Sequence, residues 1–333
     1  AVEQQLVADV PVGVFLSGGL DSSTLVAAAR ARGARKLTTI SFGFEDGLNE
    51  LPFARDVARK YATDHLELHE KSVDVAELLL KMADVFDEPF GDSSNVPAFL
   101  IAREARKHLK VVIGGEGSDE LLAGYRGWYR PLRGAKGLFN LARHQSLLRA
   151  HLERTSYFKS ADVAALGLRP PALAEEKDRG RTALERVLLW DVQNYLPGDI
   201  LVKGDRAAMA SSLEVRAPFL DRPFAEFCLK LPLGYKMDAK SDKKILRDAF
   251  SSDWPESVRG RGKQGFGAPV EKWLKGDGVR ALKREYLENP SRRIYSHIPF
   301  EAACSFVERD NYQTWALLAL SLWFENHGRT ATR

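Results

Sequence analysis

The sequence predicts an α/β fold in which a doubly wound parallel sheet is followed by a mainly helical region. Three observations support this prediction. Short apolar runs alternate with helix-like periodic runs up to Tyr125, one of those runs breaks into a Gly-Gly turn that starts a helix, and no clear strand pattern follows Tyr125. Because 333 residues suffice for about two domains of roughly 150 residues, we place the α/β core at 1–125 and the mainly helical region at 126–333.

The α/β core is predicted from runs that change their period. Strand-like runs fall at 10–16, 37–44, 65–68 and 111–114, and helix-like runs fall at 22–32, 50–61, 73–86 and 96–108. This alternation is typical of a parallel sheet that helices cover on both faces. In such sheets, ligands bind at the carboxyl ends of the strands.

The rest of the chain is predicted to be helical. Apolar residues repeat at helical spacing over 182–196, where Pro197 predicts a stop, and over 311–327, where Gly328 predicts a C-terminal cap. The stretch 121–152 has no acidic residue but several basic ones, which we interpret as a solvated helix face. A surface for a phosphate-bearing or acidic partner is the alternative.

Composition excludes several classes of protein. Hydrophobic residues make up 44% and charged residues 28%, which is globular rather than disordered composition. The net charge of +4 is too small to require nucleic acid, so no nucleic-acid partner is expected. Cys228 and Cys304 lie far apart without a CxxC pair, which predicts neither a disulfide framework nor a zinc ribbon. No apolar run approaches the roughly 20 residues of a membrane span, so we expect a cytoplasmic protein without a membrane partner.

The segment VGVFLSGGLDSS at 12–23 predicts a phosphate-binding loop between a strand and a helix. Gly18 and Gly19 allow the backbone to approach an anion closely, and the helix start supplies free N–H groups at the positive end of its dipole. Three hydroxyls can donate to phosphate oxygens, namely those of Ser17, Ser22 and Ser23. The Walker pattern GxxxxGK[ST] and the dinucleotide fingerprint GxGxxG are both missing from this segment.

SGGLDSS resembles the signature of the ATP pyrophosphatases, which cleave ATP between the α and β phosphates and adenylate a substrate. Further segments resemble the synthetase domain of glutamine-dependent asparagine synthetases. They are FEDGLNELPFARDVA at 44–58, DEPFGDSSNVP at 87–97, GGEGSDELLAGY at 114–125, YLPGDILVKGDRAAMASSLEVRAPFLD at 195–221 and RGKQGFGAPVEKWL at 261–274. The resemblance extends in order from about Asp9 to Phe324, and it implies the adenine nucleotide α hydrolase-like fold.

The resemblance implies an ATP-dependent carbon–nitrogen ligase. The side-chain carboxylate of aspartate would attack the α-phosphorus of Mg-ATP to give an acyl adenylate and pyrophosphate, and ammonia would then displace AMP to form asparagine. Related enzymes that act on another carboxylate, such as β-lactam or macrolactam synthetases, are one alternative. A tRNA-modifying ATP pyrophosphatase is a more remote alternative, which only the basic stretch at 121–152 supports.

A metal and nucleotide site is expected at the carboxyl edge of the sheet. Asp21 and Asp119 lie in separate loops at this edge, where they are placed to hold Mg²⁺ on the β and γ phosphates, a role that the resemblance also implies. Capping of a helix N-terminus is the alternative for each. The resemblance further implies contacts to the adenine and to the phosphates of ATP. They involve Leu16, Ile40 and Phe42 for adenine, and Gly114, Gly115 and Lys203 on the phosphate side.

Three residues match catalytic positions of the family, namely Glu116, Arg206 and Lys263. Glu116 would orient or deprotonate the attacking amine, provided that apolar burial does not raise its pKa. Lys263 would stabilise charge that develops at the α-phosphate. Arg206 would frame the pyrophosphate side, although structural ion pairs explain it equally well. Gly114 departs from the family, which often has Ser there, and so lacks one hydroxyl for the nucleotide.

In such families ammonia comes from glutamine, which an N-terminal domain hydrolyses with a terminal cysteine. No Cys occurs near residue 1, so we expect that the glutaminase domain is absent from this chain. Ammonia would then come from a glutaminase domain or subunit, or free ammonia or another amine would be used. A homodimer is compatible with the sequence.

Overall fold

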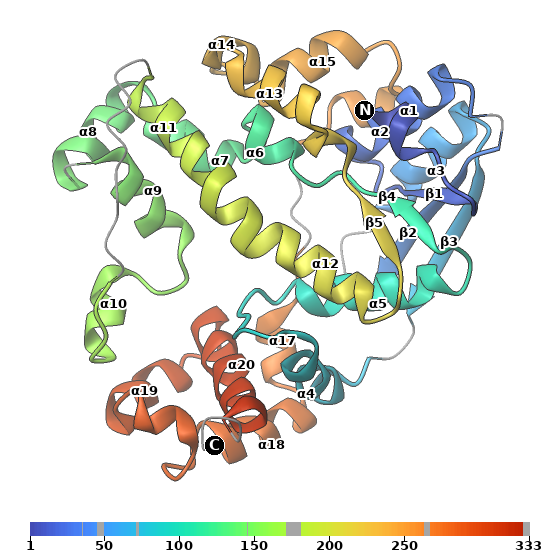
Figure 1. Ribbon diagram of the computed structural model, residues 1–333. Coiled ribbons are helices and arrows are strands. Elements are labelled where there is room, and N and C mark those ends of the chain that lie inside the picture. Colours follow the sequence, from blue (N-terminus) through green and yellow to red (C-terminus); the bar gives the residue numbers. More distant parts are fainter. Residues whose placement is uncertain are drawn as a thin grey trace. The chain divides into compact units, whose positions relative to one another are not determined.

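The computed structural model describes residues 1–34, 36–44, 50–70, 73–144, 146–170, 181–262 and 267–328. The chain divides into two compact units, each built from separate stretches (Figure 1). The α/β unit comprises the described residues of 1–71, 99–151 and 176–265, and the helical unit comprises those of 72–98, 152–175 and 266–333. The units therefore interleave along the chain, whereas the residue pattern of the sequence predicts one change, at residue 125.

The α/β unit is built on one parallel sheet of five strands in the order β3-β2-β1-β4-β5. The strands are β1 (Val12–Phe15), β2 (Thr38–Phe44), β3 (Asp64–Glu70), β4 (Val111–Ile113) and β5 (Glu214–Arg216). Central β1 pairs with both neighbours, so that Val14 lies opposite Thr39 of β2 and Ile113 of β4. From β1 the chain adds β2 and β3 on one side of the sheet, and then adds β4 and β5 on the other side of β1. This order confirms the predicted doubly wound fold.

Helices complete the α/β unit. Those that pack on the sheet are α2 (Leu20–Ala31), α3 (Leu51–Lys60), α5 (Asn95–Arg106) and α12 (Leu201–Met209). The others are α1 (Val2–Gln5), α6 (Ser118–Leu122), α7 (Arg126–Tyr129), α8 (Gly134–His144), α9 (Leu147–Thr155), α11 (Ala183–Trp190), α13 (Arg222–Lys230), α14 (Leu233–Lys236), α15 (Lys244–Phe250) and α16 (Glu256–Arg259). Two 3₁₀ helices, η1 (Arg130–Leu132) and η3 (Pro218–Leu220), and a π-helix, η2 (Asp191–Ile200), also belong here. The first residues of α5 and the last residues of α9 fall in the helical unit.

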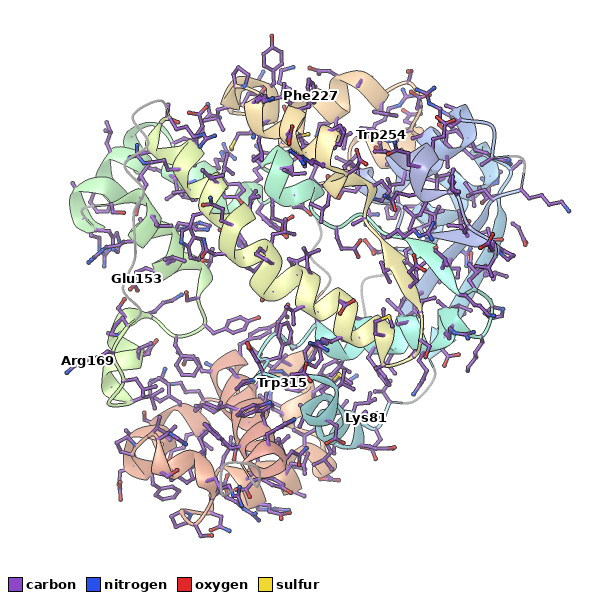
Figure 2. The ribbon with its side chains drawn as sticks, in the orientation of Figure 1. Lys81, Glu153, Arg169, Phe227, Trp254 and Trp315 are labelled. Carbon is purple, nitrogen blue, oxygen red and sulfur yellow. The ribbon has the colours of Figure 1, made fainter. Side chains whose placement is uncertain are left out.

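Both faces of the sheet are covered because successive strand residues point to opposite sides. On one face, Val14 and Ile113 pack with apolar residues of α2 and α3. On the other face, Ile40 and Val112 pack with residues of α5 and with Ala208 of α12. The buried indole of Trp254 extends the first of these two cores (Figure 2).

Two predictions about the later part of the chain are wrong. The short strand β5 joins the sheet beside β4, with Val215 opposite Val112, although no strand pattern marks it in the sequence. The helix that begins with α11 does not stop at Pro197 but continues through η2 into α12. A π turn is wider than an α turn, which gives the proline ring room beside a carbonyl that would otherwise clash with it. The strands and helices predicted before Tyr125 are confirmed.

A buried polar network ties η2 to α7 and α9. The Tyr129 hydroxyl donates to Asp191 Oδ2 at 2.6 Å, and His151 Nε2 lies 2.8 Å from Asp191 Oδ1. All three residues are at most 1% exposed. Burial, together with the charge of Asp191, raises the pKa of Tyr129 well above its ordinary value, which keeps the hydroxyl a donor. The network therefore fixes the start of the π-helix.

The helical unit is organised around α20 (Tyr312–His327), whose neighbours come from several parts of the sequence. They are α4 (Val75–Val85), α17 (Val270–Leu274), α18 (Asp277–Tyr286), η4 (Arg293–Ser296) and α19 (Phe300–Val307), and α10 (Ser160–Ala165) belongs to the same unit. Asn311 caps α20 by accepting from the N–H of Gln313 at 2.9 Å, and Gly328 is its C-cap, as predicted. Trp315, labelled in Figure 2, is 1% exposed and fills the interior of this unit.

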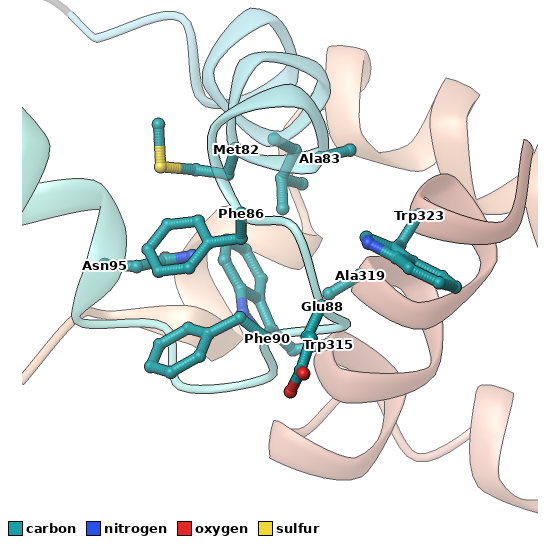
Figure 3. A pocket seen from close by; sticks show the side chains of 10 residues that line it. Met82, Ala83, Phe86, Glu88, Phe90, Asn95, Trp315, Ala319 and Trp323 are labelled. Carbon is teal, nitrogen blue, oxygen red and sulfur yellow. The ribbon is translucent and has the colours of Figure 1, made fainter. Parts of the chain in front are cut away.

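A small pocket of the helical unit has mostly apolar walls (Figure 3). Aromatic rings of Phe86, Phe90, Trp315 and Trp323 line it, and Asn95 also contributes. Its cavity volume is about 20 Å³, which accommodates about one water molecule and no larger ligand. Within the described ranges, no helix combines the length and the apolar character that crossing a membrane requires.

Candidate functional site

Strands β1 and β4 are parallel neighbours, so both end at the same edge of the sheet. The predicted phosphate loop at 16–19 follows β1, and the turn at 114–117 follows β4. Between these strands the sheet reverses its winding, because β2 lies on one side of β1 and β4 lies on the other. This is the position at which open α/β sheets bind their ligands.

The phosphate loop is a turn that requires glycine. Gly18 has φ +67°, and a Cβ there would lie 2.5 Å from Cβ of Phe53, so a side chain does not fit. The N–H of Gly19 donates to Ser17 Oγ at 3.2 Å, and the hydroxyls of Ser17 and Ser22 lie 3.2 Å apart. The structure therefore brings together two of the three predicted hydroxyls, with the Ser17 side of the loop exposed.

Arg261 holds this loop in place, although the sequence analysis does not single it out. Its guanidinium donates to the Ser17 carbonyl at 3.2 Å and forms an ion pair with Glu50 at 2.9 Å. It also lies over the Phe53 ring, 4.1 Å from the centroid. The Arg261 side chain is 8% exposed, and a charge held at this depth by three partners is a rigid support for the loop.

The two predicted metal ligands converge on one buried cation, the ammonium of Lys243. Its Nζ lies 2.6 Å from each carboxylate oxygen of Asp21 and 2.8 Å from Asp119 Oδ1. Asp21 also accepts from the Ser118 hydroxyl at 2.7 Å. The two carboxylates raise the pKa of Lys243 against the opposing effect of burial, so the ammonium stays charged. Asp21 and Asp119 are thus brought together as predicted, and Lys243 was missed.

Helix capping does not explain Asp21 and Asp119. The N-cap residues of α2 and α6 are Gly19 and Gly117, and neither aspartate occupies a cap position. Each lies in the first turn, where a carboxylate interacts favourably with the helix dipole. Among the described residues no three His, Cys, Asp or Glu side chains gather as a metal site. A pair of carboxylates nevertheless fits Mg²⁺, which commonly uses one or two carboxylates and takes its other ligands from water and phosphates.

Glu116 turns its carboxylate back toward Gly114. A Cβ at position 114 would lie 2.1 Å from Glu116 Oε2, so this arrangement requires glycine there. Oε2 is buried and makes no hydrogen bond within the part of the chain that the structure describes. Burial raises the pKa of Glu116, and the positive charge of Lys203 acts in the opposite direction. The sequence-based expectation for Glu116 as a base assumes that burial does not raise its pKa. The structure does not meet this assumption.

The remaining predicted phosphate contacts lie on both sides of this turn. The N–H of Gly114 donates to the Arg216 carbonyl at 2.9 Å and so extends the sheet ladder. Gly115 approaches Asp21 closely, since a Cβ there would lie 3.1 Å from Asp21 Cβ. Lys203 of α12 lies 3.5 Å from Asp199 and is mostly buried.

The predicted adenine contacts are part of the sheet. The N–H of Leu16 donates to the Ile40 carbonyl at 2.8 Å, and both side chains are 1% exposed. Phe42 is half-buried on β2, and Ser23 is fully buried in α2. Arg206 is exposed on α12, and Lys263 lies outside the described residues. The binding and catalytic roles of all these residues stay predictions.

The sheet order and the glycine turn after β1 are those of an α/β protein with the adenine nucleotide α hydrolase-like fold. The family model described as Asparagine synthase matches residues 1–325, so the chain belongs to the asparagine synthase family.

Individual relatives agree with this family. The chain is 28% identical to Asparagine synthetase [glutamine-hydrolyzing] 1 of Bacillus subtilis (strain 168), an alignment that covers 97% of this chain and 57% of that protein. It is 35% identical to a Putative asparagine synthetase [glutamine-hydrolyzing] of Mycobacterium tuberculosis (strain ATCC 25618 / H37Rv), over 83% of this chain and 47% of that protein. It is also 28% identical to Asparagine synthetase [glutamine-hydrolyzing] of Bos taurus, over 86% and 43%. The chain thus spans about half the length of the curated relatives that it matches.

Proposed function

We propose that this chain is the synthetase part of an ATP-dependent amide-forming ligase. It would adenylate the side-chain carboxylate of aspartate and transfer ammonia to give asparagine, AMP and pyrophosphate. The family match over residues 1–325 is the observation that carries this proposal. The convergence of Asp21 and Asp119 at the switch point supports it, because the Mg²⁺ that accompanies nucleotide phosphates requires oxygen ligands.

The proposed binding site for the triphosphate is the turn that follows β1. Its pyrophosphate would lie against Gly18, Gly19 and the first N–H groups of α2, where the helix dipole favours anions. The ion pair and hydrogen bond of Arg261 hold this turn in shape before ATP arrives. When bound by Asp21 and Asp119, Mg²⁺ supplies positive charge that neutralises the β and γ phosphates.

The proposed chemistry has two steps. In the first, an oxygen of the substrate carboxylate bonds to the α-phosphorus, and the bond from that phosphorus to the pyrophosphate oxygen breaks. The mostly buried cation of Lys203 would stabilise the charge that develops, with Arg206 and Lys263 in the roles that the family implies. In the second, the nitrogen of ammonia bonds to the acyl carbon, AMP leaves, and the nitrogen gives up a proton.

Glu116 is the proposed acceptor of that proton. Its carboxylate lies in the turn after β4, and Lys203 is close enough to influence its pKa. Burial raises this pKa toward the range in which a general base works best, because a carboxylate of higher pKa binds a proton more strongly. The positive charge of Lys203 opposes this rise and so favours the ionised carboxylate that can accept a proton.

The test is an incubation of this chain with Mg-ATP, aspartate and ammonium, followed by mass spectrometry. Asparagine formed together with an equal amount of AMP is the expected result. Asp119→Asn should lower the rate by about a hundredfold or more, by loss of charge at the transferring phosphates. The matched control is Asp248→Asn, since Asp248 is 61% exposed on α15, where it pairs with Lys244 one helical turn earlier.

The same assay distinguishes the alternatives. AMP formed only with another carboxylic acid would keep the adenylation chemistry and move the substrate to a β-lactam or macrolactam type. AMP formed only with tRNA would favour a modifying enzyme, which the family match does not support. ADP in place of AMP, or no turnover with any acid and ammonium, would contradict the proposal.

A further inference from the structure

We propose that Lys243 is a built-in counter-ion which holds the two metal-ligating carboxylates and excludes free divalent metal until the metal arrives with a triphosphate. The proposal rests on the proposed ATP chemistry for the nucleotide that brings the metal. The exclusion of free metal involves only Lys243, Asp21 and Asp119, which the structure describes. Lys243 thereby becomes a positioning residue that acts through Asp21 and Asp119.

The position of the ammonium is the first support. Nζ of Lys243 contacts both oxygens of Asp21 and one oxygen of Asp119, each within 2.8 Å. A magnesium ion would lie about 2.0–2.1 Å from these carboxylate oxygens and therefore close to the ammonium, and the two positive charges would repel each other. Because the Lys243 side chain is 3% exposed, water screens this repulsion little, and free metal would have to displace the ammonium from its carboxylate partners.

Charge gives the second support. Two carboxylates and one ammonium leave a net charge of about −1, and a divalent ion alone would turn this into about +1 in a buried place, which is unfavourable. A nucleotide changes the balance, since its β and γ phosphates carry negative charge and provide both metal ligands and new partners for Nζ. The metal is then accepted together with the triphosphate.

The surroundings are shaped for this lysine. Lys243 has φ +46° and ψ +39°, a left-handed conformation that is unfavourable for a residue with a side chain and that directs it inward at the start of α15. Gly124 leaves the necessary room, because a Cβ there would lie 2.2 Å from Lys243 Cε and 1.9 Å from Asp119 Oδ1. The Ser118 hydroxyl also donates to Asp21 Oδ1 and so helps to hold this carboxylate. Separate stretches of chain thus cooperate to place one ammonium.

The experiment measures Mn²⁺ binding to the full chain by electron paramagnetic resonance, without nucleotide. Wild-type protein should bind Mn²⁺ only in the millimolar range or more weakly. Lys243→Met, which keeps the length and removes the charge, should bind Mn²⁺ at least about tenfold more tightly, since a positive charge within about 3 Å of the ligands is gone. Lys244→Met is the matched control, because Lys244 is a half-exposed neighbour that pairs with Asp248, and it should bind like wild type.

A second measurement uses wild-type protein alone and so does not depend on the folding of a variant. Addition of α,β-methylene-ATP, which cannot be cleaved between the α and β phosphates, should create a saturable Mn²⁺ site. Micromolar Mn²⁺ binding by wild type without nucleotide, equal affinity of the Lys243 and Lys244 variants, or no Mn²⁺ site with the analogue would each overturn the proposal. Failure of asparagine synthesis would instead leave the nucleotide-free Mn²⁺ result standing, so the two proposals fail separately.

Discussion

The two units of this protein differ in whether their interiors contain charged side chains. Among the described residues, the buried acidic, basic and histidine side chains all belong to the α/β unit, namely Asp119, Glu120, His151, Asp191, Lys236, Asp242 and Lys243. The buried polar side chains of the helical unit are neutral, namely Ser93, Ser94, Asn95, Gln313, Thr314 and Ser321. Removing a charge from water is costly unless partners compensate for it. The α/β unit therefore carries groups that packing alone does not require, and the helical unit is built mainly for packing.

The largest expected effect lies in the helical unit. Trp315→Ala should lower the free energy of unfolding by about 3–5 kcal/mol, because it leaves a cavity beside the Trp273 ring. Chemical denaturation followed by circular dichroism measures this loss, which should be the same at low and high salt. Leu80→Ala, a change at a residue that is 40% exposed on α4, is the control and should cost much less. If the loss of unfolding free energy in Trp315→Ala depended on salt, the helical unit would not differ from the α/β unit in the way described here.

The second effect tests the charged interior of the α/β unit. Asp191→Ala should lower the free energy of unfolding by about 3 kcal/mol, since Tyr129 and His151 lose a buried partner. Tyr129→Phe alone should cost less, because no charge is left without compensation. If Asp191→Ala changed stability no more than Asp248→Ala at the surface, the network would not be a stabilising element.

Helix caps should affect both units equally, because a cap does not depend on the interior. Asn311→Ala in the helical unit and Thr182→Ala at the start of α11 each remove a side-chain acceptor for backbone N–H groups. Each should lower the free energy of unfolding by about 1 kcal/mol. Denaturant midpoints of the two variants measure the two losses of unfolding free energy. A large difference between these losses would show that the interior of each unit influences even the contribution of a helix cap.

The smallest effect is a pH-dependent gain at Glu116. Burial raises its folded-state pKa above the usual 4.5, so the stability linked to its proton is full below that pH and is lost as pH rises through the folded-state pKa. Glu116→Gln removes the ionised form and should make the protein slightly more stable than wild type at neutral pH. The difference should disappear in acid. Thermal unfolding over a pH series tests this, with the surface change Glu226→Gln as control; a gain that persists in acid would contradict it.

Much of the α/β unit follows from local sequence, and the parts that do not have a physical reason. Strands β1 to β4 and the glycine turn can be predicted from the spacing of apolar residues and from residue type. Strand β5 is only three residues long and has charged ends, so its place depends on pairing with β4 and not on a pattern of its own. The stop predicted at Pro197 failed because η2 provides a wider turn.

The candidate site divides in the same way. Asp21 and Asp119 could be predicted because each follows a strand at one edge of a parallel sheet. Lys243 and Arg261 could not, because both reach the site from more than two hundred residues away in sequence. Lys243 lies in a stretch that looks like ordinary basic surface, and in the family-like segment that begins at Arg261 the resemblance gives a role only to Lys263. Glu116 could be named as a candidate from the sequence, but its burial depends on Gly114 and on the fold around it.

The π-helix η2 also sets an angular offset within the long helix that runs from α11 to α12. In an α-helix each residue advances about 100° around the axis, and a π turn holds an additional residue. Deleting one residue at the exposed pair Gln193 and Asn194 would therefore rotate α12 by about 100° relative to α11. Ala208 would leave the sheet face, and Lys203 would swing away from Glu116, although helix content would hardly change. The number of residues in η2 thus sets the rotation of α12 about its axis, and this rotation helps to determine whether Lys203 faces Glu116.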